Sequence, residues 1–285
     1  MARIHATAIV EEEVELAPDV EVGPGCLLRG PIHIGAGTRL IGHVFLEGPL
    51  TLGGGNVLYP GACLGFAAQD RKFDPRVAGA GVVIGDHNVF REGSTVHRAT
   101  GEHPTRLGDR NYLMVQAHVG HDSRVGDDCT LVNGAALAGH VELHDGVILS
   151  ANASIHQFCR VGRLVMISGN RGMSRDVPPF CVCYTTRRVG GLNLVGLRRA
   201  GLRAHIRPLK HAFDLLYRKG HNRARAVELI ERELTDDPLC MEFARFVREA
   251  PQGVTGFERP RVVAAARAAS AAPQAARSEE DEAAD

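Results

Sequence analysis

The sequence predicts a mainly β protein, in which a solenoid of short stacked strands is followed by a small α-helical unit. The first observation is a six-residue period of large apolar residues that runs, with two breaks, to residue 173. The second is that glycine often follows the periodic residue, as at Gly23, Gly53 and Gly126. The third is that helical spacing replaces the six-residue period in the last third of the chain.

The six-residue period is typical of a solenoid. A helix would repeat about every 3.6 residues and a simple strand about every two, and a sandwich would show irregular spacing of about 8–12 residues. In a solenoid one aliphatic side chain per hexapeptide points inward, and the adjacent glycine turns the corner with positive φ. The periodic residues are Ile4, Val10, Leu16, Val22, Leu28, Ile34, Leu40, Leu46, Leu52, Leu58 and Leu64, then Ile84, Phe90 and Val96, then Leu107, Leu113, Val119, Val125, Leu131, Leu137, Leu143, Leu149, Ile155, Val161, Ile167 and Met173.

The pattern resembles the hexapeptide-repeat acyltransferases, whose left-handed parallel β-helix takes three hexapeptides per coil. Left-handed crossovers break the usual right-handed rule, so the expected handedness rests on this resemblance and not on the period. Two segments rich in charge, Pro and Gly, 65–81 and 97–106, interrupt the period and are expected to be loop excursions from a coil edge. The expected organisation is a left-handed β-helix at 1–189, an α-helical cap at 190–258 and a disordered Ala-rich acidic tail at 259–285.

The expected cap is helical and strongly basic. Helices are expected near Pro208, from 223 to 234 and from 239 to 249. Residues 187–232 hold twelve Arg and Lys against three acidic residues. This surface suits an anionic partner such as a phosphorylated substrate or an acidic protein, and a solvated helix face is equally compatible. Nucleic acid is not expected, because aromatic residues that could stack on bases are sparse there.

Composition argues against export and membrane insertion. The 285 residues include 33 basic and 33 acidic side chains with 44% hydrophobic content. Residues 1–20 contain four glutamates and no apolar run of signal-peptide length, and no later stretch approaches a membrane span. The seven cysteines are scattered without a CxxC pair, so we expect reduced, mostly buried thiols in a cytoplasmic protein.

Histidines gather on the third stretch of periodic sequence. In coils of three hexapeptides, residues 18 apart lie above one another at about 4.8 Å per coil, which places His121, Gly139 and Gln157 in one column. A lone histidine in a turn is more often an exposed or satisfied residue, but several on adjacent coils favour a site. The predicted cluster is His118, His121, His140, His156 and Gln157.

Two chemistries fit such a cluster. Metal ligation needs three imidazoles that converge on one point. General-base catalysis needs one imidazole, a carboxylate to orient it and a donor for an oxyanion. Asp122, directly after His121, is available for the second, and spacing alone leaves both open.

Seven short motifs resemble those of the UDP-N-acetylglucosamine 3-O-acyltransferases of lipid A biosynthesis, over residues 4 to about 250. The resemblance implies a homotrimer with sites between neighbouring prisms and no metal or other cofactor. It also implies transfer of an (R)-3-hydroxyacyl group from acyl carrier protein to the 3-hydroxyl of UDP-N-acetylglucosamine. The motifs are QDRK at 69–72, VHR at 96–98, QAHVGHD at 116–122, AGHV at 138–141, IHQFC at 155–159, DVPP at 176–179 and GLRR at 196–199.

The resemblance also implies roles at matching positions. His121 would be the general base that deprotonates the 3-hydroxyl, Asp122 would hold its tautomer, and the backbone N–H of Gly139 would stabilise the oxyanion. Gly169 falls where the family sets acyl length, and its lack of a side chain would admit longer chains. The implied substrate-binding residues are Asp70 and Lys72 for the sugar, His118, His140, His156 and Gln157 for sugar and phosphate, and Asn193 and Arg199 for the nucleotide.

The chain departs from the family pattern near the nucleotide. Val195 stands where some relatives carry glutamate, Ala200 replaces a basic residue, and residues 184–190 do not match the usual Gly-Asn linker. Arg187 and Arg188 are hypothesised to supply the missing charge. The alternative functions are a CoA-dependent acetyltransferase, a 3-amino-sugar acyltransferase, a zinc hydratase on the same scaffold and a non-catalytic trimer that binds acyl or sugar ligands.

Overall fold

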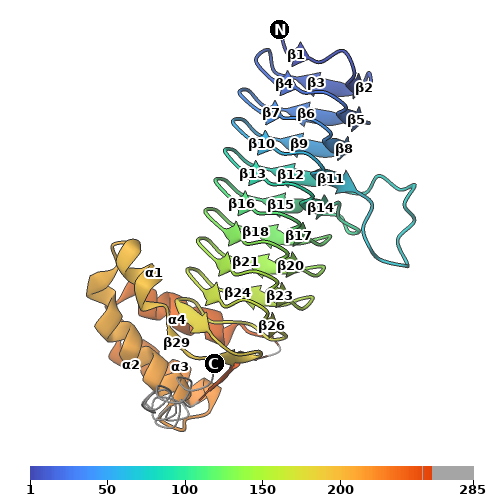
Figure 1. The fold of residues 1–285 in the computed structure, drawn as a ribbon. Coiled ribbons are helices and arrows are strands. Elements are labelled where there is room, and N and C mark those ends of the chain that lie inside the picture. Colours follow the sequence, from blue (N-terminus) through green and yellow to red (C-terminus); the bar gives the residue numbers. More distant parts are fainter. Residues whose placement is uncertain (252, 259–285) are drawn as a thin grey trace, which may run out of the picture.

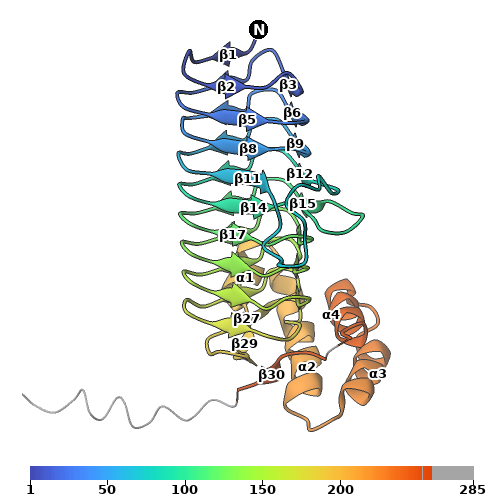
Figure 2. The same cartoon turned by 90° about the vertical axis from the view of Figure 1, so that its right-hand side faces the viewer.

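The computed structural model describes residues 1–251 and 253–258, so the tail expected to be disordered, 259–285, lies outside the described residues. The chain forms a long prism of stacked coils, with helices beside its C-terminal end and a loop that projects from one edge (Figure 1). A quarter turn shows the strands of one face stacked in order and the helices beside the lower coils (Figure 2).

Three sheets form the faces of the prism, and up to β26 each strand pairs in parallel with the strand three places later in the chain. The first sheet contains β1 (Arg3–Ile4), β4 (Glu21–Val22), β7 (Arg39–Leu40), β10 (Val57–Leu58), β13 (Val89–Phe90), β16 (Tyr112–Leu113), β19 (Thr130–Leu131), β22 (Ile148–Leu149), β25 (Met166–Ile167), β27 (Cys181–Cys183) and β29 (Gly191–Leu192). The second contains β2 (Ile9–Val10), β5 (Leu27–Arg29), β8 (Phe45–Glu47), β11 (Cys63–Phe66), β14 (Thr95–His97), β17 (His118–Val119), β20 (Ala136–Leu137), β23 (Ser154–Ile155) and β26 (Gly172–Met173). The third contains β3 (Val14–Leu16), β6 (Ile32–Ile34), β9 (Leu50–Leu52), β12 (Val82–Ile84), β15 (Thr105–Leu107), β18 (Arg124–Val125), β21 (Glu142–Leu143) and β24 (Arg160–Val161).

The periodic aliphatic residues fill the prism, as predicted. Every periodic residue from Val22 to Met173 is at most 4% exposed. Burying one such side chain contributes about 1.5–3 kcal/mol, so the column is the main source of stability. Ile4 is 50% exposed because it lies in the first coil, which has a neighbour on one side only.

The two predicted loop excursions are confirmed by the strand register. Val22 pairs with Leu40, one regular coil later. Leu58 pairs with Phe90, and Phe90 pairs with Leu113, so these two coils contain extra residues. The extra residues leave the prism between β11 and β12 and between β14 and β15, after which the stack resumes.

Glycine is required after the periodic residue for a reason other than the expected one. A Cβ on Gly85 would lie 2.0 Å from Oδ1 of Asp109 in the next coil, which accepts a hydrogen bond from the Asp86 N–H at 2.8 Å. The expectation that these glycines adopt positive φ is wrong. Positive φ occurs further along the turn, as at His87 (φ 56). Close approach between coils, and not a left-handed backbone, requires glycine here.

The C-terminal region is helical, as expected. The helices are α1 (Leu194–Arg199), the short 3₁₀ helix η1 (Arg203–His205), α2 (Ile206–Tyr217), α3 (Arg223–Glu233) and α4 (Pro238–Arg248). Asp237 caps α4, since its carboxylate accepts hydrogen bonds from the backbone N–H of Leu239 and Cys240.

The expected domain boundary at residue 190 stays a prediction. β27 pairs antiparallel with β29 across it, and β28 (Arg188–Val189) pairs with β30 (Gly256–Phe257) at the end of the described chain. Buried residues of the prism and of the helices also belong to one hydrophobic cluster. The structure therefore joins the two predicted units by strand pairing as well as by packing.

Two smaller expectations concern thiols and membranes. Six of the cysteines are buried and Cys63 is half-buried, and all seven are free. This agrees with the expected role of most of them as core residues. Among the helices of the described residues, none combines the length and the hydropathy that crossing a bilayer requires.

Candidate active site

The candidate site lies on the turns between the second and third sheets. Asp122, His140 and Phe158 occupy the same position in three successive turns, and all three have positive φ, 60°, 60° and 64°. The His140 N–H donates to the His121 carbonyl at 2.9 Å, and the Phe158 N–H donates to the Gly139 carbonyl at 3.3 Å. The predicted column through His121 and Gly139 is therefore present.

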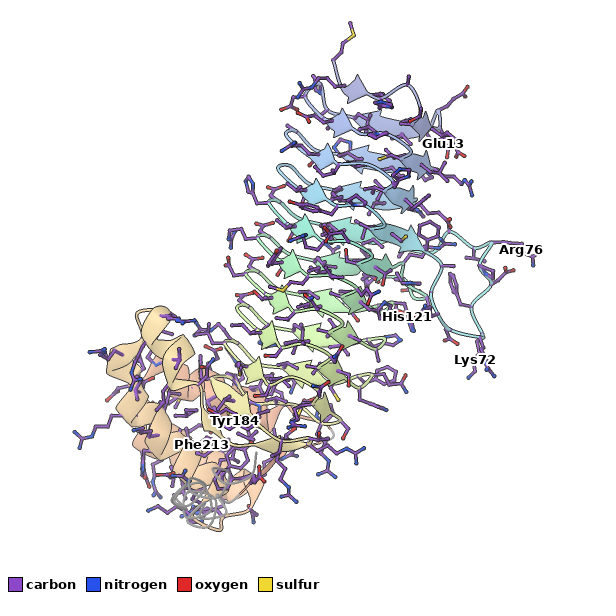
Figure 3. All side chains as sticks on the ribbon, in the orientation of Figure 1. Glu13, Lys72, Arg76, His121, Tyr184 and Phe213 are labelled. Carbon is purple, nitrogen blue, oxygen red and sulfur yellow. The ribbon has the colours of Figure 1, made fainter. Side chains whose placement is uncertain are left out.

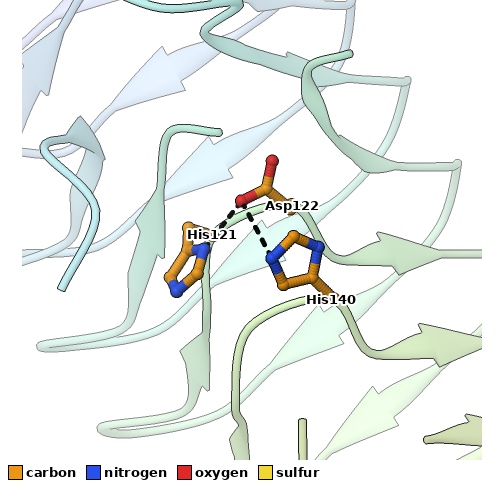
Figure 4. Close-up of side chains that lie close together, drawn as sticks. All are labelled: His121, Asp122 and His140. Atoms are coloured by element: carbon orange, nitrogen blue, oxygen red, sulfur yellow. Dashed lines mark hydrogen bonds and ion pairs between the residues drawn. The ribbon is translucent and has the colours of Figure 1, made fainter. Parts of the chain in front are cut away.

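His121 and Asp122 form a hydrogen-bonded dyad. His121 Nδ1 lies 2.7 Å from Asp122 Oδ2, and the two side chains are only 14% and 9% exposed (Figure 4). Because a carboxylate accepts only, Nδ1 carries the proton and Nε2 of the neutral ring is left as an acceptor. This is the tautomer that a general base requires.

The carboxylate of Asp122 is held by the second loop. It accepts hydrogen bonds from the Thr100 N–H at 3.1 Å, the Thr100 hydroxyl at 2.7 Å and the Gly101 N–H at 3.1 Å. Burial alone would raise the pKa of Asp122, but the hydrogen bonds from His121, Thr100 and Gly101 outweigh burial and lower the pKa. The carboxylate is therefore ionised at neutral pH. Sequence reasoning missed Thr100, whose one signal was its place in an interrupting loop.

Gly139 lies directly against the imidazole of the dyad. A Cβ on this glycine would be 2.5 Å from Cε1 and 2.6 Å from Nε2 of His121. Its backbone N–H has no hydrogen-bond acceptor among residues 1–251 and 253–258. Gly139, whose backbone donor is unused, thus lies beside the ring edge that carries the free Nε2, and an N–H near the base can stabilise an oxyanion formed there.

His140 is the third member of this cluster. Its Nε2 lies 3.6 Å from Asp122 Oδ2, and its ring meets the His121 ring edge-on with centroids 5.3 Å apart. Its other neighbour is Phe158, which is 51% exposed and stacks on it at 4.6 Å. Ligand atoms of His121, Asp122 and His140 lie within 4.8 Å of one another and could hold a metal ion.

His118 belongs to an adjoining pair of imidazoles. Its Nδ1 lies 2.8 Å from the Thr95 hydroxyl, and its ring meets that of His97 edge-on at 5.3 Å. Burial, with smaller effects from His97 and His121, lowers the pKa of His118 to about 4, so the ring is neutral at neutral pH. His97 Nδ1 donates to the Ala67 carbonyl at 2.6 Å. His97 is part of the VHR motif, but the motif alone predicts no role for it.

The remaining predicted residues on this side are exposed. His156 Nδ1 lies 3.2 Å from the carbonyl of Gln157, and both side chains face solvent. Asp70 and Lys72 lie on the first loop, where the Lys72 N–H donates to Asp70 Oδ1 at 2.9 Å. Figure 3 shows Lys72 at the end of this loop, away from the prism and on the same side as His121.

Three predicted residues are not brought to His121 within one chain. Asn193 and Arg199 belong to α1 and its cap, on the side of the prism opposite the first loop (Figures 1 and 2). The Asn193 amide is already used, since Oδ1 accepts from the Gly196 N–H at 2.9 Å and Nδ2 donates to the Leu164 carbonyl at 2.8 Å. Gly169 lies in a turn between the first and second sheets.

The cap presents a concentrated positive charge. A hollow of about 620 Å³ on α1, η1 and α2 is lined by Ile206 and four positively charged side chains. None of them forms an ion pair with another described residue. The four are Arg198, Arg203, Arg207 and Lys210.

Known proteins of one kind resemble this chain. The profile of a family described as Udp N-acetylglucosamine O-acyltransferase, Domain 2, matches residues 176–255. The acyl-[acyl-carrier-protein]–UDP-N-acetylglucosamine O-acyltransferase of Thermodesulfovibrio yellowstonii is 36% identical over 258 residues, covering 89% of this chain and 99% of the relative. The protein of that name from Anaeromyxobacter sp. (strain Fw109-5) is 40% identical over 256 residues, covering 88% and 99%.

Solved structures agree with these relatives. The UDP-N-acetylglucosamine acyltransferase of Francisella novicida superposes with a TM-score of 0.84 at 32% identity, covering 91% of this chain and 95% of the other. The UDP-N-acetylglucosamine acyltransferase of Campylobacter jejuni gives a TM-score of 0.84 at 31% identity, covering 90% and 100%. The similarity therefore includes the prism and the helical region together.

Proposed function

Because this chain belongs to the family of acyl-[acyl-carrier-protein]–UDP-N-acetylglucosamine O-acyltransferases, we propose that it transfers an (R)-3-hydroxyacyl group from acyl carrier protein to the 3-hydroxyl of UDP-N-acetylglucosamine. This reaction is the first step of lipid A biosynthesis. The fold is the predicted left-handed parallel β-helix with a helical C-terminal region. The observation that carries the proposal is the His121–Asp122 dyad, whose free Nε2 lies beside the unused N–H of Gly139.

The dyad and the glycine suffice for acyl transfer. His121 Nε2 accepts the proton of the 3-hydroxyl while the sugar oxygen bonds to the thioester carbon. The carbonyl oxygen becomes an oxyanion, which the Gly139 N–H stabilises. The tetrahedral intermediate collapses with cleavage of the C–S bond, and the leaving thiolate takes the proton back from His121. Asp122 stays ionised throughout and stabilises the imidazolium.

The substrate contacts are proposed from the family's matching positions. Asp70 and Lys72 contact the sugar from the first loop. His118, His140, His156 and Gln157 bind sugar and phosphate. Because His118 is neutral, it recognises its ligand by hydrogen bonding and not by charge. Asn193 and Arg199 meet the nucleotide, and Gly169 sets the acyl length.

A homotrimer is part of the proposal. Asn193, Arg199 and Gly169 are remote from His121 in one chain, so a neighbouring subunit has to bring the corresponding residues to the site. The second sheet offers an apolar outer surface for such packing near its N-terminal end. Its outward-facing residues there are Ile9, which is 61% exposed, and the half-buried Leu27, Phe45 and Cys63.

The cationic hollow of the cap supports acyl carrier protein as the donor. An acidic carrier would approach Arg198, Arg203, Arg207 and Lys210, which lack partners of opposite charge within the described residues. The KM for the carrier should then rise steeply with ionic strength, and replacement of these cations should raise it at low ionic strength. A cytoplasmic location stays a prediction.

Mass spectrometry of the product tests the function. The protein is incubated with UDP-N-acetylglucosamine, or with its 3-amino analogue, and a series of hydroxyacyl carriers of different chain length. We expect an O-acylated product from the hydroxyl sugar with the carrier as donor. Preferred use of the amine would establish the 3-amino-sugar alternative, and equal turnover with CoA thioesters would favour the acetyltransferase alternative. If no pair of donor and acceptor gives a product, the result would favour the alternative of a non-catalytic trimer that binds acyl or sugar ligands.

A further inference from the structure

We propose that Arg98 is a positioning residue, which holds the first loop (67–81) in the place where Asp70 and Lys72 can reach the substrate. The part of this inference that concerns turnover rests on the proposed function. The part that concerns the loop rests only on contacts within the chain. Arg98 is the first residue after β14, where the second loop begins, so it lies outside the loop that it holds.

The guanidinium of Arg98 joins the prism to the loop. Nη1 donates to Glu47 Oε1 at 2.6 Å and to the Gly65 carbonyl at 3.1 Å, both at the edge of the second sheet. Nη2 donates to the carbonyls of Pro75 and Val77, at 2.6 and 3.2 Å, in the middle of the loop. One planar group therefore bridges two parts of the molecule.

The guanidinium of Arg98 is buried, which indicates that its contacts with the prism and the loop are needed to stabilise its charge. Arg98 is 3% exposed, and a buried charge is costly unless it is paired and hydrogen-bonded. Its guanidinium carbon lies 5.9 Å from the ring centroid of Phe73, which gives the loop one further contact with Arg98. By contrast, Lys72 and Arg76 extend outward from the loop (Figure 3).

The backbone around Arg98 holds the ends of the same loop. The Arg98 N–H donates to the Phe66 carbonyl at 2.9 Å, and the Ala99 N–H donates to the Gly81 carbonyl at 3.2 Å. The next residue, Thr100, holds Asp122. Loss of the Arg98 side chain should therefore release the middle of the loop while its ends and the dyad stay in place.

Kinetics provide the first test. In Arg98→Gln we expect the KM for UDP-N-acetylglucosamine to rise about tenfold or more, with a smaller change in kcat, because the dyad is untouched. Arg98→Lys should be intermediate, since an ammonium cannot bridge Glu47 and two carbonyls as a planar fork does. Lys72→Ala should add little to Arg98→Gln, because both act through one loop.

Limited proteolysis provides a test that does not depend on activity. Arg71, Lys72 and Arg76 are exposed trypsin sites on the loop. We expect Arg98→Gln to be cut there about tenfold faster than the parent. Arg39→Gln, at an exposed arginine on β7, is the matched control and should be cut in the loop at the parent rate. If Arg98→Gln does not fold, Glu47→Gln gives the same comparison.

The outcomes separate the two proposals. Unchanged loop cleavage and unchanged KM in a folded Arg98→Gln protein would overturn the inference. A parent protein that does not acylate UDP-N-acetylglucosamine, together with faster loop cleavage in the variant, would overturn the proposed function and leave the loop anchor standing. Faster cleavage without a change in KM would show that Arg98 holds the loop but that the loop does not bind the sugar, which also overturns the inference.

Discussion

The imidazole of His121 lies directly against Gly139 of the next coil, so closely that a Cβ on the glycine would be 2.5 Å from ring atom Cε1. The pair brings together an acceptor nitrogen and a backbone donor in adjacent turns. Their spacing depends on the stacking of the coils, which backbone hydrogen bonds such as that from the His140 N–H to the His121 carbonyl maintain. Chemistry at this site therefore depends on backbone packing as much as on side-chain identity.

Gly139→Ala should abolish most activity without unfolding the prism. The added methyl group has to displace the His121 ring from Asp122, and we expect kcat to fall by about 100-fold. Gly191→Ala is the control, because a Cβ there meets nothing within 4 Å. Turnover and melting temperature are measured for both, and a fully active Gly139→Ala protein would contradict the proposed placement of the base.

His121→Gln should remove the general base and leave binding intact. The expected loss in kcat is about 10² to 10⁴-fold, the usual contribution of a positioned base. Calorimetry with UDP-N-acetylglucosamine and the oligomer mass in solution should match the parent. Retained turnover would show that another group takes the proton.

Thr100→Ala should move the acid side of the pH–rate profile upward. Thr100 helps to lower the pKa of Asp122. Without the Thr100 hydroxyl, Asp122 becomes protonated at a higher pH. His121 then loses its negatively charged partner at that higher pH. We expect kcat to drop about fivefold at neutral pH. Thr100→Ser keeps the hydroxyl and should restore the parent profile; the same profile in both variants would argue against this role.

His118 should make the protein sensitive to acid. Its pKa in the folded protein, about 4, lies below the ordinary value of 6.5. Between these values the unfolded chain binds a proton that the folded chain does not, so stability falls as the pH drops from about 6.5 to about 4 and changes no further below that. The loss is about 3 kcal/mol.

His118→Asn should flatten this part of the stability curve. Denaturant unfolding at a series of pH values measures the effect, with His221→Asn, at an exposed histidine of the cap, as the control for loss of an imidazole. An equally steep curve in His118→Asn would place the acid sensitivity elsewhere.

Chelation should leave turnover unchanged, because no step of the proposed mechanism uses a metal ion. His121, Asp122 and His140 could nevertheless bind zinc, which would occupy the base, so added zinc should inhibit. Metal analysis and assays before and after dialysis against a chelator measure this. Stoichiometric zinc in the purified protein, held by His118, His121 or His140, would support the hydratase alternative.

The prism and the column of His121 and Gly139 were predictable because, in coils of constant length, the spacing in sequence determines the position in space. Counting in eighteens places Gly139 against His121, and counting in sixes within each uninterrupted stretch gives the buried periodic residues from Val22 to Met173. The same counting does not find Thr100 or His97. The second loop adds residues to their coil, so their distance in sequence no longer reports their distance in space.

Two further features depend on contacts that a periodic pattern does not contain. The contacts of Arg98 with Pro75 and Val77 follow from the conformation of a loop without repeats. The glycines next to the periodic residues were recognised, but for the wrong reason, because the close approach of backbone or of an aspartate carboxylate from the neighbouring coil is visible only in three dimensions. Asn193 and Arg199 could not be placed at the site from one chain, because the proposed role of both residues requires a neighbouring subunit.

The stack resumes after each excursion with the pairing it had before, as Leu58 with Phe90 and Phe90 with Leu113 show. The length of the connection between β11 and β12, or between β14 and β15, therefore does not change how the following coils align. Relatives can therefore lengthen or shorten the first connection during evolution while the geometry of acyl transfer is inherited unaltered, whereas Thr100 of the second connection holds Asp122 and couples that connection to the dyad. Substrate preference and catalytic competence can then diverge separately within one scaffold.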